Sequence, residues 1–219
     1  MKLALFDLDH TLLSGDSDVL WCDYLMQEGL LDRATFAPRN AQMEASYKAG
    51  TVDAADFAGF YVSTLAGRTP TDLEPVRRAF LAREVLPRIP QAARDLVDGH
   101  RRAGDLVVMT TATNRYITEL TAATFGIEHL IATEVEIEHG RFTGLTRDLP
   151  NMREGKVTRL ATWLAGRGLA LDDCNSTAYS DSINDLPLLK AVNRAVAVDP
   201  DPRLEAVARK ADWPVLRLR

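Results

Sequence analysis

Residues 3–11 read Leu-Ala-Leu-Phe-Asp-Leu-Asp-His-Thr, and this stretch decides the fold. Its first four residues are apolar, a run that is too short for a helix and that suits a strand buried on both faces. Asp7 and Asp9 follow directly, and residues two apart on an extended chain project to the same side. We therefore predict a buried first strand, Leu3–Phe6, that carries two carboxylates at its carboxyl end.

Strands and helices alternate through most of the remaining chain. Apolar runs predict further buried strands at 106–109, 177–179 and 195–198, with helical periodicity between them. This alternation indicates an α/β fold with a doubly wound, Rossmann-like parallel sheet that is covered by helices on both faces. Residues 134–143 instead alternate polar and apolar side chains around His139-Gly140, which predicts a β-hairpin appended to the main sheet.

Residues 16–83 show a different pattern, in which long helical stretches are broken at glycines. This pattern predicts a helical domain inserted after the first strand. Thr71–Glu74 has the sequence of a capping box and should begin a helix that runs toward Val85. Pro87 then marks the return to the main domain. We therefore expect a catalytic core and a helical cap. The core comprises 1–14 and 87–219, and the cap comprises 15–86.

The composition is that of a globular protein, and it limits the partners. The chain has 219 residues, of which 46% are hydrophobic and 26% are charged, enough for a core domain and a smaller one. A net charge of -5 offers no basic excess for a nucleic acid, and no segment approaches the ~20 uninterrupted apolar residues of a membrane span. Cys22 and Cys174 have no other Cys or His at metal-ligand spacing. We therefore expect a soluble, cytoplasmic protein with reduced thiols and without nucleic-acid or membrane partners.

Four polar clusters follow apolar strands or begin helices. In an open parallel sheet, ligands bind beyond the carboxyl ends of the strands, so a site is expected at these places. Paired carboxylates repel each other unless a cation such as Mg²⁺ joins them, and hydroxyl, backbone N–H and ammonium groups suit phosphate oxygens. Each cluster alone could be a helix cap or a solvated loop, but their joint arrangement is hard to reach by chance. The clusters are Asp7–Thr11, Met109–Asn114, Gly155-Lys156 and Tyr179–Asp185.

This ordered set resembles the four signature motifs of the haloacid dehalogenase superfamily, and in particular its phosphoserine-phosphatase-like branch, subfamily IB. The resemblance covers nearly the whole chain, including the inserted helical cap, which is similar to the C1 type. It implies a Mg²⁺-dependent phosphatase that hydrolyses a small phosphorylated metabolite through an aspartyl-phosphate intermediate. Two alternatives stay open: a phosphotransferase that passes the phosphoryl group to an alcohol, and a non-catalytic module that binds a phospholigand on the same scaffold.

The resemblance also implies roles for individual residues. Asp7 would attack phosphorus, and Asp9 would protonate the leaving oxygen and later activate a water molecule. Magnesium would be held by the Asp7 carboxylate, the Asp9 backbone carbonyl and Asp181. Thr111 would hydrogen-bond the phosphoryl group, with Thr110 as the alternative if the register differs.

Two further positions complete the implied machinery. Lys156 would offset the charge of the phosphoryl group, and Asp185 would orient the lysine or a metal-bound water. The other residues expected to contact the substrate are Thr11, Asp16, Asn114, Ser182 and Asn184.

Substrate choice in this branch is attributed to the cap. Phosphoserine phosphatases use an acidic residue and an arginine there; Asp16 matches the acidic position, whereas Tyr61 stands where the arginine would lie. The motif with His10 and Trp21 is similar to that of other members of the branch, some of which act on histidinol phosphate. Histidinol phosphate and phosphoserine-like compounds are therefore the candidate substrates. His10 could contact the leaving group or pack at the cap hinge, and the cap aromatics could line a pocket or form the cap core.

Overall fold

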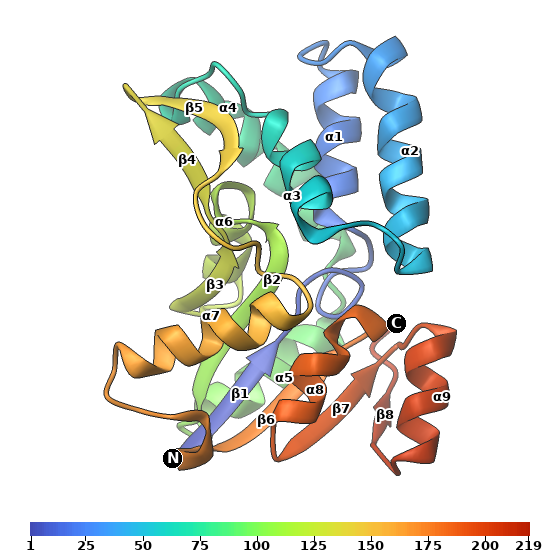
Figure 1. Cartoon of the computed structure of the whole chain (residues 1–219), viewed down its shortest axis with the longest axis vertical. Coiled ribbons are helices and arrows are strands. Elements are labelled where there is room, and N and C mark those ends of the chain that lie inside the picture. Colours follow the sequence, from blue (N-terminus) through green and yellow to red (C-terminus); the bar gives the residue numbers. More distant parts are fainter.

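The computed structural model describes residues 1–219 and contains a six-stranded parallel sheet with the order β3-β2-β1-β6-β7-β8 (Figure 1). The order reverses at β1, whose neighbours are β2 and β6. In doubly wound sheets, ligands bind at such a reversal, beyond the carboxyl ends of the strands. The predicted α/β fold is confirmed. The strands are β1 (Lys2–Phe6), β2 (Leu106–Asn114), β3 (His129–Thr133), β6 (Asn175–Ser180), β7 (Arg194–Val198) and β8 (Val215–Leu216).

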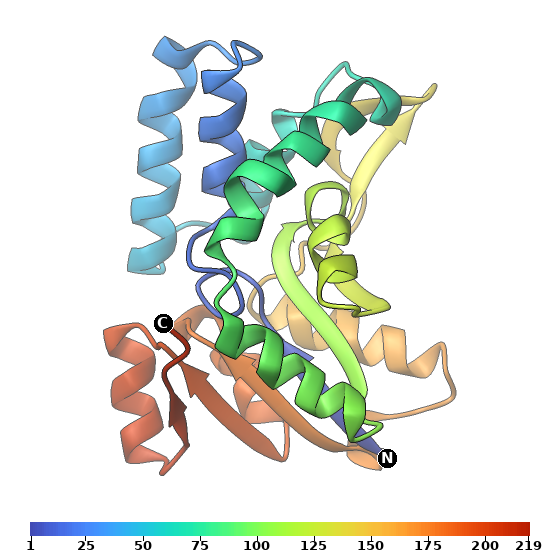
Figure 2. The same ribbon diagram turned by 180° about the vertical axis from the view of Figure 1, so that it is seen from behind.

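Two opposite layers of helices cover the sheet (Figures 1 and 2). Leu3 and Leu5 of β1 are buried in the cluster formed with one layer, and Ala4 and Phe6 are buried in the cluster formed with the other. The strands are therefore apolar on both faces, as expected for a covered parallel sheet. The first layer consists of α7 (Glu154–Ala165), α8 (Leu186–Ala191) and α9 (Pro202–Lys210), and the second consists of α5 (Gln91–Arg102) and α6 (Arg115–Thr124).

The helices between β1 and α5 stand beyond the carboxyl ends of the strands and form the cap (Figure 2). The α-helices among them each begin at a side chain that accepts hydrogen bonds from the N–H groups of the first turn. These capping residues are Asp16, Asp32, Asp53 and Thr69. The helices are α1 (Ser17–Gln27), α2 (Arg33–Ala49), α3 (Ala54–Ser63) and α4 (Pro70–Phe80), and a π turn (Leu81–Val85) and a 3₁₀ turn (Leu86–Arg88) follow.

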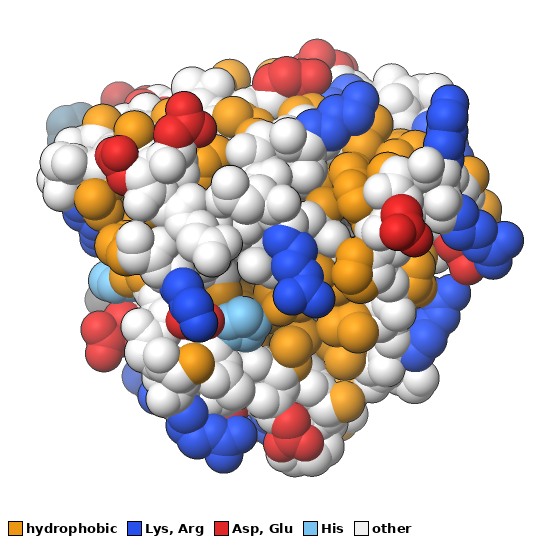
Figure 3. Space-filling model, turned by 90° about the horizontal axis from the view of Figure 1, so that it is seen from below, with side chains coloured by type: hydrophobic (Ala, Val, Ile, Leu, Met, Phe, Trp, Pro, Cys, Tyr) orange, Lys and Arg blue, Asp and Glu red, His pale blue; other side chains and the backbone are white.

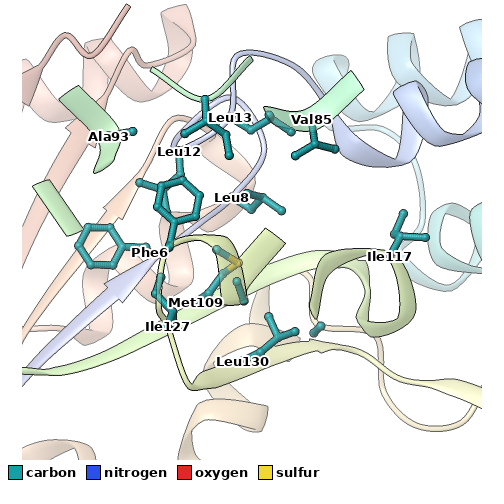
Figure 4. Close-up of a cluster of buried hydrophobic side chains, with 14 of the residues drawn as sticks. Phe6, Leu8, Leu12, Leu13, Val85, Ala93, Met109, Ile117, Ile127 and Leu130 are labelled. Atoms are coloured by element: carbon teal, nitrogen blue, oxygen red, sulfur yellow. The ribbon is translucent and has the colours of Figure 1, made fainter. Parts of the chain in front are cut away.

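The apolar core continues from the sheet into the cap. Figure 4 shows Phe6 and Met109 of the sheet near Leu8, which follows β1, and Val85, which ends the π turn. These side chains belong to one cluster of 28 buried residues that also contains side chains of α1 and α4. Because the two units share this cluster, the division at 15–86 stays a prediction.

The helix that was predicted from Thr71 begins earlier. Its capping box is formed by Thr69 and Asp72, and not by Thr71 and Glu74. The Asp72 N–H donates to Thr69 Oγ1 at 3.0 Å, and Pro70 is the first helical residue. Proline suits this position because its missing N–H would have no intrahelical partner there. Pro70 therefore favours the capping box of Thr69 and Asp72 over the predicted one of Thr71 and Glu74.

The predicted hairpin forms a separate two-stranded sheet, β4 (Val135–Glu138) and β5 (Arg141–Thr146). It hydrogen-bonds the cap and does not extend the main sheet. The Phe142 N–H donates to the Arg68 carbonyl at 2.9 Å, and the Gly67 N–H donates to the Phe142 carbonyl at 2.8 Å. The Phe142 ring is buried in the cluster shared by cap and core, and this burial holds the hairpin against the cap.

Charges are mixed on the surface. On the face seen in Figure 3, Lys and Arg side chains are interspersed with acidic, apolar and uncharged groups. None of the helices combines the length and hydropathy needed to cross a membrane.

Candidate active site

Asp7 lies at the carboxyl end of β1, where the strand order reverses, and only 6% of its surface is exposed. Lys156 Nζ donates to its Oδ1 at 2.7 Å, and Thr11 Oγ1 lies 3.2 Å from its Oδ2. Thr11 Oγ1 is also 3.1 Å from Asp181 Oδ1, and it accepts the Asp181 N–H at 3.0 Å. The Thr11 hydroxyl therefore bridges two carboxylates, and its single proton can serve only one of them at a time.

Lys156 is a buried cation between two carboxylates. It projects from the first turn of α7, where a side chain at Gly155 would collide with the carbonyl oxygen of Pro150. Its Nζ donates to Asp7 Oδ1 at 2.7 Å and to Asp185 Oδ2 at 2.6 Å. Burial alone would lower the pKa of Lys156, but the charges of Asp185 and Asp7 outweigh it and raise that pKa. Lys156 is therefore a fixed positive charge beside the predicted nucleophile.

The side chain of Asp9 is turned toward the cap. Its Oδ1 accepts the Ser17 N–H at 2.7 Å, at the start of α1. Its Oδ2 accepts from Thr113 Oγ1 at 2.9 Å and from Thr111 Oγ1 at 3.3 Å. None of these contacts involves Lys156. The carboxylate thus joins the cap entrance to the end of β2, a position suited to proton transfer at a group held between cap and core.

Asp16 links the cap entrance to a pocket of about 290 Å³. The N–H groups of Asp18 and Val19 both donate to its Oδ1 at 3.0 Å, whereas its Oδ2 has no hydrogen bond within the protein. Burial raises the pKa of Asp16 to about 8, and the charge of Asp9 adds to this effect. A pKa of about 8 leaves Asp16 largely protonated at neutral pH while the pocket is empty, and a cationic amine in the pocket would favour its ionised form. The unpaired Oδ2 is then available to that amine. The pocket is lined by His10, Asp16, Tyr47, Lys48, Asp181, Ser182, Asp199, Asp201, Pro202 and Arg219.

The remaining predicted contact residues make hydrogen bonds within the protein. Thr110 Oγ1 accepts from Asn151 Nδ2 at 3.0 Å, so the structure sets Thr111, and not Thr110, beside Asp9. Asn114 caps α6 by accepting the Ile117 N–H at 3.3 Å. The other two predicted residues lie on the loop after β6, where the Asn184 N–H donates to Ser182 Oγ at 3.2 Å and Asn184 Nδ2 donates to the Tyr47 carbonyl at 3.2 Å.

The cap aromatics form the core of the cap. Trp21, Phe57, Phe60 and Tyr61 are all buried. Trp21 Nε1 donates to Thr64 Oγ1 at 3.0 Å, inside the cap. The Tyr61 hydroxyl likewise donates to the side chain of a cap residue. Of the two readings of these aromatics, cap core and pocket lining, the structure supports the first. His10 does line the pocket, and it has a positive φ of 55°.

Comparisons with known proteins identify the family of this chain. The family model of haloacid dehalogenase-like hydrolases matches residues 4–190. The chain belongs to this family. A histidinol-phosphatase of Neisseria meningitidis serogroup C (strain 8013) is 41% identical to this hydrolase over 220 residues, which cover 100% of this chain and 99% of that protein.

Solved structures resemble this haloacid dehalogenase-like hydrolase over its whole length. A protein of unknown function from Bordetella pertussis Tohama I is 44% identical, with a TM-score of 0.94 and coverage of 100% of this chain and 99% of that one. A phosphoserine phosphatase, in a structure of a phospho-aspartyl intermediate analogue, has a TM-score of 0.71 at 17% identity and shares the fold; the match covers 100% and 93% of the two chains. These findings confirm the predicted family, its phosphoserine-phosphatase-like branch and the enzyme class, a phosphatase.

The donors in the site of this hydrolase fit a hard divalent cation. Burial raises the pKa of Asp7 to about 7 in spite of the Lys156 charge, and burial and the charge of Asp7 raise the pKa of Asp181. The single ammonium group of Lys156 thus does not balance the negative charge of the surrounding carboxylates. A bound cation would reduce the repulsion between these carboxylates. No three His, Cys, Asp or Glu side chains converge on one point. A magnesium ion does not need them, since it takes one or two carboxylates and completes its shell with other oxygens and water.

Some residues of the site received no individual role from the sequence, although Thr113 and Ser180 lie within two of the predicted polar clusters, 109–114 and 179–185. Thr113 donates to Asp9, and Ser180 Oγ donates to Asp185 Oδ2 at 2.8 Å. Both are polar residues at the ends of the predicted strands, a signal that could have found them. Tyr47 comes from α2 and lines the pocket. No local pattern marks it, because its place depends on how the cap docks on the core.

Proposed function

We propose that this phosphatase hydrolyses small phosphomonoesters in a Mg²⁺-dependent reaction through an aspartyl phosphate on Asp7. The observation that carries the proposal is the position of Asp7, held between Lys156 and the Thr11 hydroxyl with Asp181 beside it. A carboxylate oxygen of Asp7 forms a bond to phosphorus while the bond from phosphorus to the substrate oxygen breaks. Lys156 offsets the charge of the phosphoryl oxygens throughout.

Asp9 moves the protons in this scheme. It donates a proton to the leaving alcohol oxygen in the first step, and takes one from the water that attacks the phosphoenzyme in the second. Inorganic phosphate leaves and free Asp7 is restored. The hydroxyl groups of Thr111 and Thr113 and the Ser17 N–H fix the Asp9 carboxylate for this role.

Asp7, Asp181 and the backbone carbonyl of Asp9 would hold the magnesium ion. When bound, the ion neutralises charge on a phosphoryl oxygen and holds the substrate near the nucleophile. The buried thiols of Cys22 and Cys174 suit a reducing compartment, and we place the enzyme in the cytoplasm.

We propose a phosphomonoester with a cationic amine as the substrate, and histidinol phosphate is the first candidate. Asp16 presents an unpaired carboxylate oxygen to the pocket, and the relative from Neisseria meningitidis is a histidinol-phosphatase. Tyr61, which occupies the predicted arginine position, points into the cap core and offers no cation for a substrate carboxylate. Phosphoserine is therefore the second candidate.

The purified protein should release phosphate from histidinol phosphate in the presence of Mg²⁺, and EDTA should lower the rate at least about 100-fold. Excess Mg²⁺ should restore it. The assay uses a panel that also contains phosphoserine and phenyl phosphate, with glycerol added as an alternative acceptor. Release that is insensitive to EDTA would exclude the metal, and phosphorylated glycerol in place of phosphate would indicate a phosphotransferase. Thermal stabilisation by the esters without turnover would indicate a binding module.

Asp16→Asn should raise KM for histidinol phosphate about tenfold or more while KM for phenyl phosphate changes little. The amide can still cap α1, but it cannot form the charge-assisted bond to an amine, which is worth about 1.5–3 kcal/mol. Asp53→Asn is the matched control, because Asp53 caps α3 through the same two N–H contacts on an exposed surface. Equal losses on both substrates would contradict amine recognition by Asp16.

A further inference from the structure

The carboxyl end of α2 is held by side chains from the core. Asn184 Nδ2 donates to the first of four consecutive carbonyls at 3.2 Å. Arg203 donates to the next two, from Nη2 at 3.4 Å and from Nη1 at 3.0 Å. Arg153 Nη2 donates to the last at 3.0 Å. The four carbonyls belong to Tyr47, Lys48, Ala49 and Gly50.

These contacts suit the physical character of a helix end. The last carbonyls of a helix lack the regular partner four residues on and carry partial negative charge, so guanidinium groups are favoured there. The Tyr47 carbonyl also accepts the Gly50 N–H at 2.9 Å, so Asn184 is its second donor. The donors come from distant parts of the chain: Arg203 from the first turn of α9, and Arg153 from the residue before α7. Figures 1 and 2 both show the end of α2 facing the start of α9. Cap and core therefore meet at this helix end.

Gly50 makes room for the contact. It has a positive φ of 71°, and a Cβ there would lie 2.7 Å from Arg203 Nη2 and 2.9 Å from Nη1. A side chain at this position would push the guanidinium away from the helix end. Arg153 also donates from Nε to Asn184 Oδ1 at 3.4 Å, so the donors support one another. We call Arg153, Asn184 and Arg203 the clasp.

The clasp sets the position of Tyr47. This residue lies in the last turn of α2, and its carbonyl is one of the four that the clasp holds. Tyr47 also lines the pocket of about 290 Å³ together with Asp16 and Asp181. Its ring packs on Phe57, with centroids 4.9 Å apart, and its hydroxyl has no hydrogen bond within the protein. Burial and the charge of Asp185 raise the pKa of Tyr47, so its phenol stays protonated and able to donate.

We propose that the clasp positions Tyr47 as a hydrogen-bond donor to the bound substrate, so that Tyr47 is a substrate-binding residue and Arg153, Asn184 and Arg203 are positioning residues. The proposal rests on the phosphomonoesterase activity proposed above. A phosphoryl oxygen or a hydroxyl of the substrate is the group that a phenol in this pocket would meet. Loss of the clasp frees the end of α2 and weakens substrate binding, while the nucleophile and Lys156 are untouched.

The test compares Arg203→Ala with Arg209→Ala, an exposed arginine on the same helix that pairs with Glu205 and does not reach α2. For histidinol phosphate, or for whichever ester of the panel is turned over, Arg203→Ala should raise KM about three- to tenfold with kcat nearly unchanged. Arg209→Ala should leave both constants as in the wild type. Arg203→Lys should recover part of the loss, because an ammonium can still donate to a carbonyl.

A glycine pair tests the same contact without touching either arginine. Gly50→Ala should raise KM like Arg203→Ala, because the new Cβ displaces the guanidinium. Gly29→Ala is its control: Gly29 has a similar positive φ of 69°, yet a Cβ there meets nothing within 4 Å. Both variants carry the same backbone strain. A KM that rises equally in both variants would overturn the proposal, since strain alone would then explain it.

A double-mutant cycle decides whether the clasp acts through Tyr47. Tyr47→Phe should raise KM about tenfold, and the double variant Tyr47→Phe with Arg203→Ala should be no worse than Tyr47→Phe alone. Additive effects would overturn the link between the clasp and Tyr47.

Hydrogen exchange tests the clasp independently of activity. If the wild type turns over no ester, the proposed function fails by itself, but amides in the last turn of α2 should still exchange faster in Arg203→Ala than in Arg209→Ala. Equal exchange would refute the clasp.

Discussion

Asp7→Asn should abolish turnover, with a loss of at least about 10³-fold in kcat, while the folded structure is kept. The amide has nearly the same shape as the carboxylate, and its oxygen can still accept from Lys156. It is, however, a far poorer nucleophile, so no aspartyl phosphate forms. Phosphate release under saturating ester and Mg²⁺ measures the loss, and circular dichroism with a thermal melt measures the fold.

The control for this variant is Asp98→Asn, which removes an exposed carboxylate that pairs with Arg101 on the surface of α5. It should retain wild-type activity. Acid quenching of the wild type during turnover of a ³²P-labelled ester should trap label on the protein, and Asp7→Asn should trap none. Activity of Asp7→Asn within tenfold of the wild type would rule out Asp7 as the nucleophile.

The candidate site residues whose proximity could be predicted from the sequence are those with a local signal. Asp7 directly follows four apolar residues, and Lys156 stands in the first turn of a helix. The carboxyl ends of parallel strands, and the starts of the helices that follow them, lie at one edge of the sheet. A residue predicted at either kind of position is therefore also predicted to lie at that edge. The ion pair of Asp7 with Lys156 joins positions 149 residues apart in the sequence.

The roles that were not predicted depend on how far a strand extends and on contacts between distant segments. Thr113 lies within the predicted polar cluster 109–114 but received no role of its own, because the strand was predicted to end at Met109, whereas β2 continues to Asn114 through a run of threonines. Threonine is β-branched and favours strands, yet the run lacks the apolar pattern that predicts burial. Tyr47 and the clasp depend on the docking of the cap, which brings α2 against segments more than 100 residues away. No spacing in the sequence could have shown that contact.

Lys156→Met should destroy activity and also destabilise the protein, by about 3–5 kcal/mol. Methionine fills a similar volume, but it leaves Asp7 and Asp185 buried side by side without the cation that now lies 2.7 and 2.6 Å from them. Urea denaturation without Mg²⁺ measures the loss of stability. Lys190→Met, at an exposed position in α8, is the control and should change the free energy of unfolding by less than about 0.5 kcal/mol.

A second substitution separates the two roles of Lys156. The double variant Lys156→Met with Asp185→Asn removes one of the two buried charges, so it should regain much of the lost stability because the remaining carboxylate no longer faces a like charge. It should stay inactive, since no group then offsets the phosphoryl charge beside Asp7. Recovery of activity together with stability would mean that Lys156 only supports the fold. Stability that returns without activity would show that the loss of activity in Lys156→Met does not result from the loss of stability.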